Sequence, residues 1–293
     1  MITKILLLIT IYATLFAKSG AIFAVYDQVT ANAKTFMVYL YLDEKPKSAY
    51  VAYLGKRYPF FKKPNDDGYY ALIPTSYYQK PKDTTATIVY TTDKKRYLTS
   101  QIFIEDAKYK KERLRVDPSK AKFSKKALIR IKKEAKEAKK IYNHYTKKLY
   151  FNSPFILPLH SKITSAFGNK RVFNGILKSY HSGTDFRAKM GTPIIASNRG
   201  KVVLVKNRFF AGNSVVIDHG EGIYSGYYHL SKFAVKLGDI VEKGQVIGYS
   251  GATGRVTGPH LHFTFHVGGV CVDPLQFVKL VNENLFYQNT STQ

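Results

Sequence analysis

The chain has 293 residues, 45% of them hydrophobic, which is enough for two modest domains and excludes a chain that is disordered throughout. The formal net charge of +26 predicts anionic partners, such as an acidic polymer or a lipid surface. No nucleic-acid recognition motif accompanies this charge, so nucleic acid is not expected among the partners. Cys271 is the only cysteine, which excludes a disulfide within the chain.

Residues 1–21 are typical of an export signal. Lys4 supplies a short positive start, residues 5–17 form an apolar run, and the small residues Ser19 and Ala21 suit a cleavage site. The run is shorter than the roughly 20 apolar residues that a spanning helix needs. We therefore predict a cleaved signal peptide, with an uncleaved membrane anchor as the alternative.

Residues 22–106 predict a small β-sandwich-like module. Short segments rich in Tyr, Val, Ile and Thr alternate with turn-prone pieces such as Asp66-Asp67-Gly68, and the expected strands are 36–42, 50–54, 69–73, 86–90 and 97–104. The segment contains no pattern typical of a catalytic site. Its expected role is that of an accessory module or a folded prodomain.

Residues 107–152 predict a basic linker that contains a helix from Ser124, a suitable N-cap, to about Tyr150. Its apolar residues recur in steps of three and four, at Leu128, Ile131, Ala135, Ala138, Tyr142, Tyr145 and Leu149. Residues 107–150 hold 17 Lys and Arg against four Asp and Glu, a net of +13. The charges indicate the solvated face of a linker helix. A dedicated surface for an anionic polymer or membrane is the alternative.

Residues 153–280 predict a compact antiparallel β-domain, because short strands alternate with glycines and no helical pattern is strong. Pro154 and Pro158 mark its beginning, and residues 281–293 are expected to be a tail. The predicted fold is therefore mainly β, with two β-domains joined by a basic helix.

Seven of the eight histidines follow residue 159, and their spacing predicts a metal site. His181 and Asp185 lie four residues apart across a turn, and His260 and His262 share one face of a predicted strand. A catalytic zinc uses three His or carboxylate ligands and keeps one position open for water, while further imidazoles can move protons. His229 ends an apolar stretch between these groups. Each signal is weak alone, and the prediction rests on their combination.

Seven blocks between residues 155 and 280 together resemble the lysostaphin-type (LytM-like) metallopeptidases. They are 163–168 (ITSAFG), 181–185 (HSGTD), 191–194 (GTPI), 212–220 (GNSVVIDHG), 228–230 (YHL), 238–248 (GDIVEKGQVIG) and 253–262 (TGRVTGPHLH). The resemblance implies one Zn²⁺ ion held by His181, Asp185 and His262. It also implies catalytic roles for His260, which would deprotonate the attacking water, and His229, which would steady the charged intermediate.

The resemblance implies an exported zinc metallopeptidase that cleaves peptide crosslinks or stem peptides of peptidoglycan in cell-wall remodelling and shape. A D,D-endopeptidase of the periplasm is expected, with carboxypeptidase action left open and inner-membrane association expected if the signal stays uncleaved. The alternative is a non-catalytic relative that binds peptidoglycan or activates another wall hydrolase, although such relatives have usually lost metal ligands. Protein partners are not indicated. We also expect the front half to restrain activity by lying over the substrate groove.

Two further patterns have other interpretations. Residues 238–248 resemble the hairpin of biotin- and lipoyl-carrier domains, but Lys243 lies between Glu242 and Gly244 rather than between methionines. His266 continues the strand face of His260 and His262, which predicts a histidine at the rim of the site or within it. His219 is expected to be structural.

Overall fold

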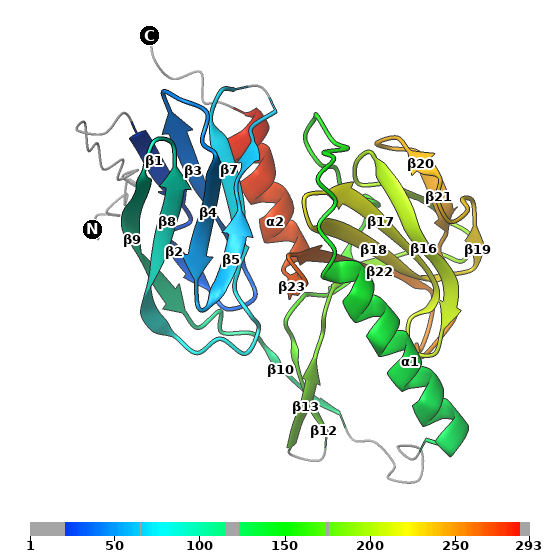
Figure 1. The fold of residues 1–293 in the computed structure, drawn as a ribbon. Helices are drawn as coiled ribbons and strands as arrows, with labels where there is room; N and C mark the ends of the chain where they lie inside the picture. Colours follow the sequence, from blue (N-terminus) through cyan, green and yellow to red (C-terminus); the bar gives the residue numbers. More distant parts are fainter. Residues whose placement is uncertain (1–20, 65, 115–122, 174–175, 288–293) are drawn as a thin grey trace, which may run out of the picture.

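The computed structural model describes residues 21–64, 66–114, 123–173 and 176–287, and the predicted mainly-β fold is confirmed (Figure 1). The predicted signal peptide lies outside these residues except for Ala21, which begins the first strand. Within the described ranges, no helix is long and apolar enough to cross a membrane.

The N-terminal module consists of two sheets that pack face to face. In spatial order, the first sheet contains β1 (Ala21–Tyr26), β3 (Thr35–Leu42), β7 (Tyr69–Pro74) and β6 (Phe61–Lys62). The second contains β2 (Val29–Ala31), β9 (Lys95–Glu105), β8 (Lys82–Thr91), β4 (Ser48–Tyr53) and β5 (Lys56–Pro59). Alternate side chains of both sheets fill the core between them, as in other β-sandwiches, and Phe36, Val51 and Ile88 are fully buried there.

The C-terminal domain is built on a large antiparallel sheet. Its order is β11 (Ile163–Ser165), β14 (Thr184–Arg187), β22 (His260–Val267), β18 (Ile223–Leu230), β17 (Gly212–Gly220), β16 (Gly200–Arg208) and β20 (Ile240–Val241), with β23 (Val270–Val272) paired to β22. A smaller sheet contains β15 (Pro193–Ile195), β21 (Val246–Tyr249) and β19 (Lys232–Phe233). A third sheet joins β10 (Lys111–Leu114) from the linker to β12 (Lys170–Phe173) and β13 (Ile176–Tyr180).

Helix α1 (Lys125–Tyr142) begins at Ser124, whose side chain accepts a hydrogen bond from the amide of Ala127, so the predicted N-cap is confirmed. The helix is shorter than expected, because Asn143 caps it and the following residues leave the helical path. There, main-chain hydrogen bonds join Thr146 to Glu221 and Tyr150 to His219. The prediction of a helix to about Tyr150 was therefore wrong.

Helix α1 packs on the large sheet, over β16, β17 and β18 (Figure 1). Tyr142 is buried there, with Ala138 and Ile141 partly buried beside it. Leu128 and Ala135, which the predicted stripe placed on the buried face, are exposed. Glu134 is buried instead, because its carboxylate accepts hydrogen bonds from Arg130 and from the amide of Phe209.

The chain ends in two helical segments, α2 (Pro274–Val281) and the π-helix η2 (Asn282–Phe286). The prediction of a tail from residue 281 was wrong, because Leu285 is buried and the Asn282 side chain hydrogen-bonds both main-chain groups of Phe155. Helix α2 also contacts the module, where the Gln276 side chain bonds the amide and the carbonyl of Thr35. Met37, Tyr70 and Leu72 of the module lie in the same apolar cluster as the C-terminal core. The two halves are thus packed together.

Candidate metal centre and active site

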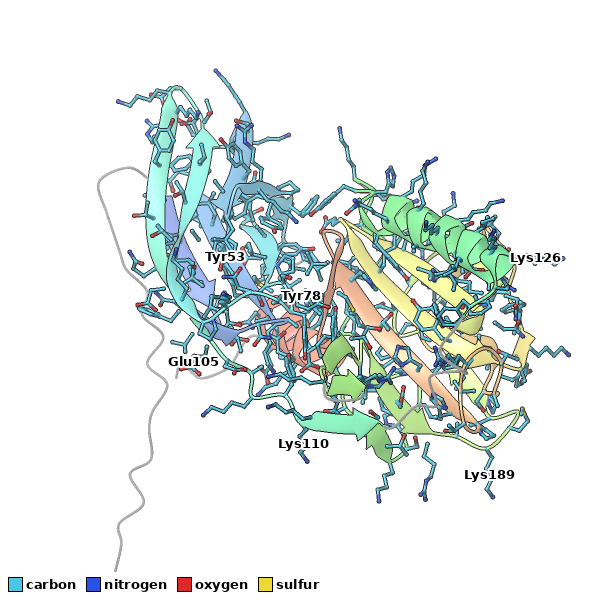
Figure 2. The ribbon with its side chains drawn as sticks, turned by 90° about the horizontal axis from the view of Figure 1, so that it is seen from below. Tyr53, Tyr78, Glu105, Lys110, Lys126 and Lys189 are labelled. Carbon is cyan, nitrogen blue, oxygen red and sulfur yellow. The ribbon has the colours of Figure 1, made fainter. Side chains whose placement is uncertain are left out.

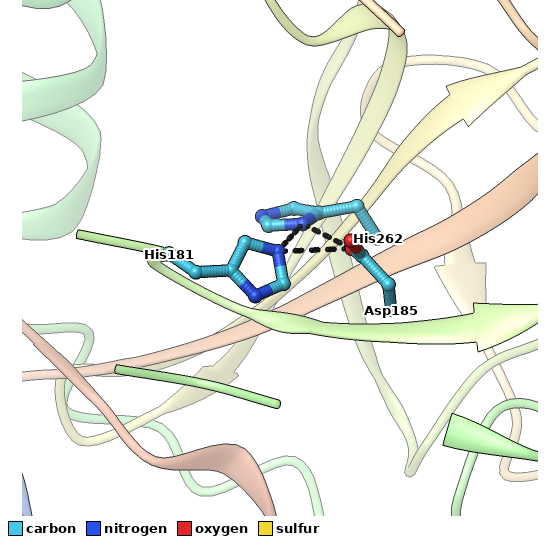
Figure 3. A group of neighbouring side chains, drawn as sticks. All are labelled: His181, Asp185 and His262. Carbon is cyan, nitrogen blue, oxygen red and sulfur yellow. Dashed lines mark hydrogen bonds and ion pairs between the residues drawn. The ribbon is translucent and has the colours of Figure 1, made fainter. Parts of the chain in front are cut away.

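The three predicted metal ligands converge on one point of the large sheet. Asp185 on β14 lies directly opposite His262 on the neighbouring strand β22, and His181 precedes β14 by three residues. His181 Nε2 lies 3.0 Å from both Asp185 Oδ1 and His262 Nδ1, and those two atoms are 2.7 Å apart (Figure 3). Residues 77 positions apart in sequence are therefore brought together by strand pairing.

This donor set fits a zinc ion. Two imidazole nitrogens and one carboxylate oxygen are usual ligands of a catalytic zinc, at about 2.1 Å from the metal. Tetrahedral geometry at that distance requires ligand atoms about 3.4 Å apart. The observed separations of 2.7 and 3.0 Å would thus need to widen by about 0.7 and about 0.4 Å.

Hydrogen bonds to the main chain hold His181 in the protonation state that a ligand needs. Its Nδ1 lies 2.8 Å from the carbonyl oxygen of Ala166, which can only accept, so Nδ1 carries the proton and Nε2 keeps its lone pair. The main chain of His181 pairs with Gly168 and Asn169 on the same loop. Such outer contacts are typical of metal-binding histidines, where they fix the ring orientation.

The electrostatics of Asp185 keep the carboxylate charged. Burial alone would raise the pKa of Asp185, but its close contacts with the His181 and His262 rings lower the pKa well below its usual range. The pKa of His262 is lowered chiefly by burial, against the opposing effect of Asp185. An anionic oxygen and a neutral imidazole are the forms that bind a divalent cation.

Two more predicted site residues, His229 and His260, lie beside this cluster. Their rings are 4.9 Å apart, and His260 Nε2 lies 3.8 Å from Asp185 Oδ1. Each Nδ1 donates to a backbone carbonyl, that of Thr253 for His229 and that of Gly258 for His260. In the neutral form of each ring, Nε2 is therefore the nitrogen with the lone pair. The side chains of the two predicted ligands Asp185 and His262 are each 13% exposed and that of His260 is 19% exposed, so solvent reaches the cluster.

His229 adopts an unusual backbone conformation at the end of β18. Its φ of 62° lies in the left-handed region, which costs a residue other than glycine of order 1 kcal/mol and recurs at functional sites. The turn brings the His229 ring within 5.8 Å of the His262 ring, although Tyr228, the preceding residue, also faces His262. Burial, followed by the charge of His262, lowers the pKa of His229 to about 4.

Sequence reasoning missed the structural role of Gly183. A Cβ at this position would lie 2.5 Å from the carbonyl oxygen of Phe263 and 2.6 Å from Nε2 of His262. Only glycine lets the turn between His181 and Asp185 pass this closely over the β22 strand. The signal that could have indicated this role was the position of the glycine in the HSGTD block, between the predicted ligands His181 and Asp185.

The remaining histidines of interest lie away from the cluster. His266 shares the strand face of His262, as predicted, but its ring is half-buried and lies flat against Tyr142 of helix α1. The expectation of a histidine at the rim of the site or within it was wrong, because helix α1 covers this end of the strand. His219 is fully buried and bonds the carbonyl of Arg199 and the hydroxyl of Ser225, which is a structural role.

Comparisons with known proteins agree with this geometry. The model of peptidase family M23 matches residues 179–274. The peptidoglycan DD-endopeptidase ShyA of Vibrio cholerae is 51% identical over 96 residues, which are 33% of this chain and 22% of ShyA. Lysostaphin of Staphylococcus staphylolyticus is 40% identical over 111 residues, 36% of this chain and 23% of lysostaphin. The chain thus matches less than a quarter of the length of either relative.

A solved structure extends the similarity to both halves of the chain. The crystal structure of a peptidase M23 candidate from Pseudomonas aeruginosa is 28% identical, with a TM-score of 0.64, and the match covers 89% of this chain and 95% of that one. The N-terminal module and the C-terminal domain therefore recur together in a known fold. The C-terminal domain of this chain is therefore a peptidase family M23 domain, similar in sequence to lysostaphin.

Proposed function

We propose that this protein is an exported, zinc-dependent peptidoglycan hydrolase that cleaves peptide crosslinks, most simply as a D,D-endopeptidase. The observation that carries the proposal is the convergence of His181, Asp185 and His262, with two further imidazoles beside them. ShyA, which shares half of its residues with this chain over the matched segment, is described as a peptidoglycan DD-endopeptidase. The same chemistry applied to stem peptides would be that of a carboxypeptidase, which is the second candidate activity.

The metal ligands are proposed to be His181, Asp185 and His262, holding one Zn²⁺ ion. When bound, zinc supplies Lewis acidity and lowers the pKa of a water molecule in its open position to near neutrality. The single negative charge of Asp185 leaves the ion with a net positive charge. With Asp185 as the single anionic ligand, the occupied site would favour the negative charge that develops on a carbonyl oxygen during peptide hydrolysis.

His260 is proposed to be the base that takes the proton from the attacking water. Its Nε2 has a lone pair and lies 3.8 Å from Asp185 Oδ1, at the edge of the ligand cluster. It can then return the proton to the leaving amine. General acid–base catalysis of this type contributes about 10²- to 10⁴-fold to a rate.

His229 suits a different role. Its pKa of about 4 makes it neutral at pH 7, and its Nδ1 proton is committed to the carbonyl of Thr253. A lone pair on Nε2 accepts a hydrogen bond, whereas steadying an anion requires a donor. We therefore assign to His229 the orientation of the attacking water or of a substrate amide, in place of the stabilising role that the sequence suggested.

A test of the function compares the muropeptides that the purified full-length chain releases from sacculi, with and without a zinc chelator, by mass spectrometry. The proposed enzyme releases products of crosslink cleavage, contains one equivalent of zinc and loses activity with the chelator. Loss of terminal D-alanine alone would indicate a carboxypeptidase. A zinc-loaded chain that binds sacculi and releases nothing would instead support the non-catalytic regulator, against which the complete ligand set argues.

We further propose an extracytoplasmic, periplasmic location with a cleaved signal peptide at residues 1–21, and contact of helix α1 with an anionic wall or membrane surface. The contact is supported by eight exposed basic side chains on this helix, of which Lys126 is labelled in Figure 2. The eight are Lys125, Lys126, Arg130, Lys132, Lys133, Lys136, Lys139 and Lys140. Attraction of this kind weakens as salt rises. Co-sedimentation with phosphatidylglycerol vesicles, but not with phosphatidylcholine vesicles, at low salt would support the membrane surface.

A further inference from the structure

A cluster of aromatic side chains joins the N-terminal module to the segment that carries His181. Tyr77 follows β7 in the module, Tyr109 lies in the linker, and Phe167 and Tyr180 belong to the C-terminal domain. Figure 2 shows the neighbouring Tyr78 where the module meets the C-terminal domain, whereas Tyr53 lies within the module. The cluster is outside the metal site but reaches the residue immediately before a metal ligand.

Tyr77 touches the ligand segment in two ways. Its ring stacks on that of Tyr180, with centroids 3.7 Å apart and planes within 5° of parallel. Its hydroxyl donates a hydrogen bond of 2.8 Å to the carbonyl of Gly168. Tyr180 is bonded covalently to His181, and the amide of Gly168 donates to the carbonyl of His181 at 2.8 Å. Tyr77 is therefore connected to His181 through a single intervening residue in two ways, by way of Tyr180 and by way of Gly168.

Tyr109 holds the same loop from the other side. Its ring packs so closely on Gly168, which has a φ of 85°, that a Cβ there would lie 2.2 Å from the ring. Its hydroxyl donates to the carbonyl of Asn32 in the module, and its ring stacks on Tyr77 at 5.3 Å. The loop of residues 165–169 is thus covered by side chains that the front half of the chain supplies.

This loop is what orients the His181 ring. The carbonyl of Ala166 fixes the Nδ1 proton, and Gly168 and Asn169 pair with the His181 main chain. His181 itself is only 1% exposed, so its position depends on these neighbours and not on solvent. Outer-shell contacts that aim a metal-binding imidazole typically change metal affinity by about 10- to 100-fold when they are removed.

We propose that Tyr77 is a positioning residue, through which the N-terminal module holds His181 in the geometry that binds the metal. The proposal rests on the function proposed above, since it concerns the same metal site. It assigns the module a supporting role: the C-terminal domain binds zinc at full affinity only when the module is seated against Tyr180 and Gly168. The stacked rings carry most of the effect, and the hydroxyl adds to it.

The test measures zinc affinity of the full-length chain by competition with a chromophoric chelator. Tyr77→Leu removes the stack and the hydrogen bond and is expected to weaken zinc binding about 10- to 100-fold, and Tyr77→Phe keeps the ring and is expected to give a smaller loss. Substitution of cobalt for zinc adds a measurement that does not depend on global stability. The visible spectrum of the cobalt site in Tyr77→Leu should change shape, because His181 is misplaced.

Tyr53→Leu is the matched control, because Tyr53 is equally buried in the module, 2% exposed against 6% for Tyr77, but packs on Phe36 inside the sandwich. It should lower the melting temperature and leave zinc affinity unchanged. Wild-type affinity in Tyr77→Leu, or an equal loss in Tyr53→Leu, would overturn the inference. If Tyr77→Leu does not fold, wild-type affinity in Tyr77→Phe overturns the part assigned to the hydroxyl, and an altered cobalt spectrum in Tyr77→Phe supports it. A wild-type chain that binds no zinc would instead refute the proposed function.

Discussion

Tyr142 of helix α1 lies flat against His266 of β22, with ring centroids 3.7 Å apart and planes within 2° of parallel. The Tyr142 hydroxyl also lies 2.7 Å from that of Tyr228, whose ring contacts the proposed metal ligand His262 at 5.6 Å. Helix α1 is therefore fastened to the sheet at the turn that carries His229. The linker helix therefore helps to support the strands that carry the proposed site residues.

Removal of the Tyr142 side chain should destabilise the protein through this contact. Tyr142→Ala leaves a cavity between the helix and the sheet and should lower the free energy of unfolding by about 3 to 5 kcal/mol. Tyr142→Phe loses only the hydroxyl partner of Tyr228 and should cost about 1 kcal/mol. Urea denaturation of both variants measures the difference, and equal losses would show that the ring contributes nothing beyond the hydrogen bond.

The spacing of the histidines and the resemblance to a known family together predicted a group of residues that the structure brings close to one another. A His-x-His pair on one strand puts both rings on one face, and the HSGTD block closes a tight turn. Pairing of Asp185 opposite His262 could not be predicted in the same way, because strand register depends on contacts between distant segments. The left-handed backbone conformation of His229 could not be predicted either, because alternation along a strand carries no information on φ.

Errors in the predicted fold have identifiable causes. His266 fits the same period of two as His262, but helix α1, whose position periodicity does not predict, covers its ring. Helix α2 was missed because its eight residues are too few for a strong stripe. The Asp273-Pro274 pair, an N-cap followed by proline at the first helical position, was the local signal for its start.

Gly183→Ala should weaken zinc binding although no ligand is changed. The added methyl group would meet the Phe263 carbonyl and the His262 ring, so either the turn or the ligand must move. We expect at least a tenfold loss of zinc affinity, on the order of the effect of an outer-shell change. Gly258→Ala is the control, because a Cβ there has no atom within 4 Å. Equal affinity of both variants would contradict the steric argument.

Asp185→Ala and His260→Ala should separate metal binding from catalysis. Asp185→Ala removes the only charged ligand, so zinc content measured by elemental analysis and muropeptide release should both fall to background. His260→Ala should keep one equivalent of zinc and lose roughly 10²- to 10⁴-fold in rate. His160→Ala, at an exposed histidine, is the control and should retain both. Loss of zinc in His260→Ala would make it a ligand rather than a base.

The interface between module and C-terminal domain contains a buried acid, Glu221, which is 7% exposed and accepts a hydrogen bond from the Tyr70 hydroxyl. Burial raises its pKa from an ordinary 4.5 to about 8. The folded protein therefore binds this proton more tightly than the unfolded chain does. The resulting stability is fully present below pH 4.5 and is lost as pH rises through about 8.

Glu221→Gln mimics the protonated acid at every pH and should flatten this dependence. Wild type and variant should have similar free energies of unfolding near pH 4.5, and the variant should become the more stable by on the order of 3 to 5 kcal/mol at pH 8. The difference between the two profiles cancels the contributions of buried histidines, which both proteins share. Glu242→Gln, at an exposed acid paired with Arg199, should shift stability by less than about 1 kcal/mol at any pH. Parallel profiles for wild type and Glu221→Gln would show that Glu221 ionises in the folded protein as it does in water.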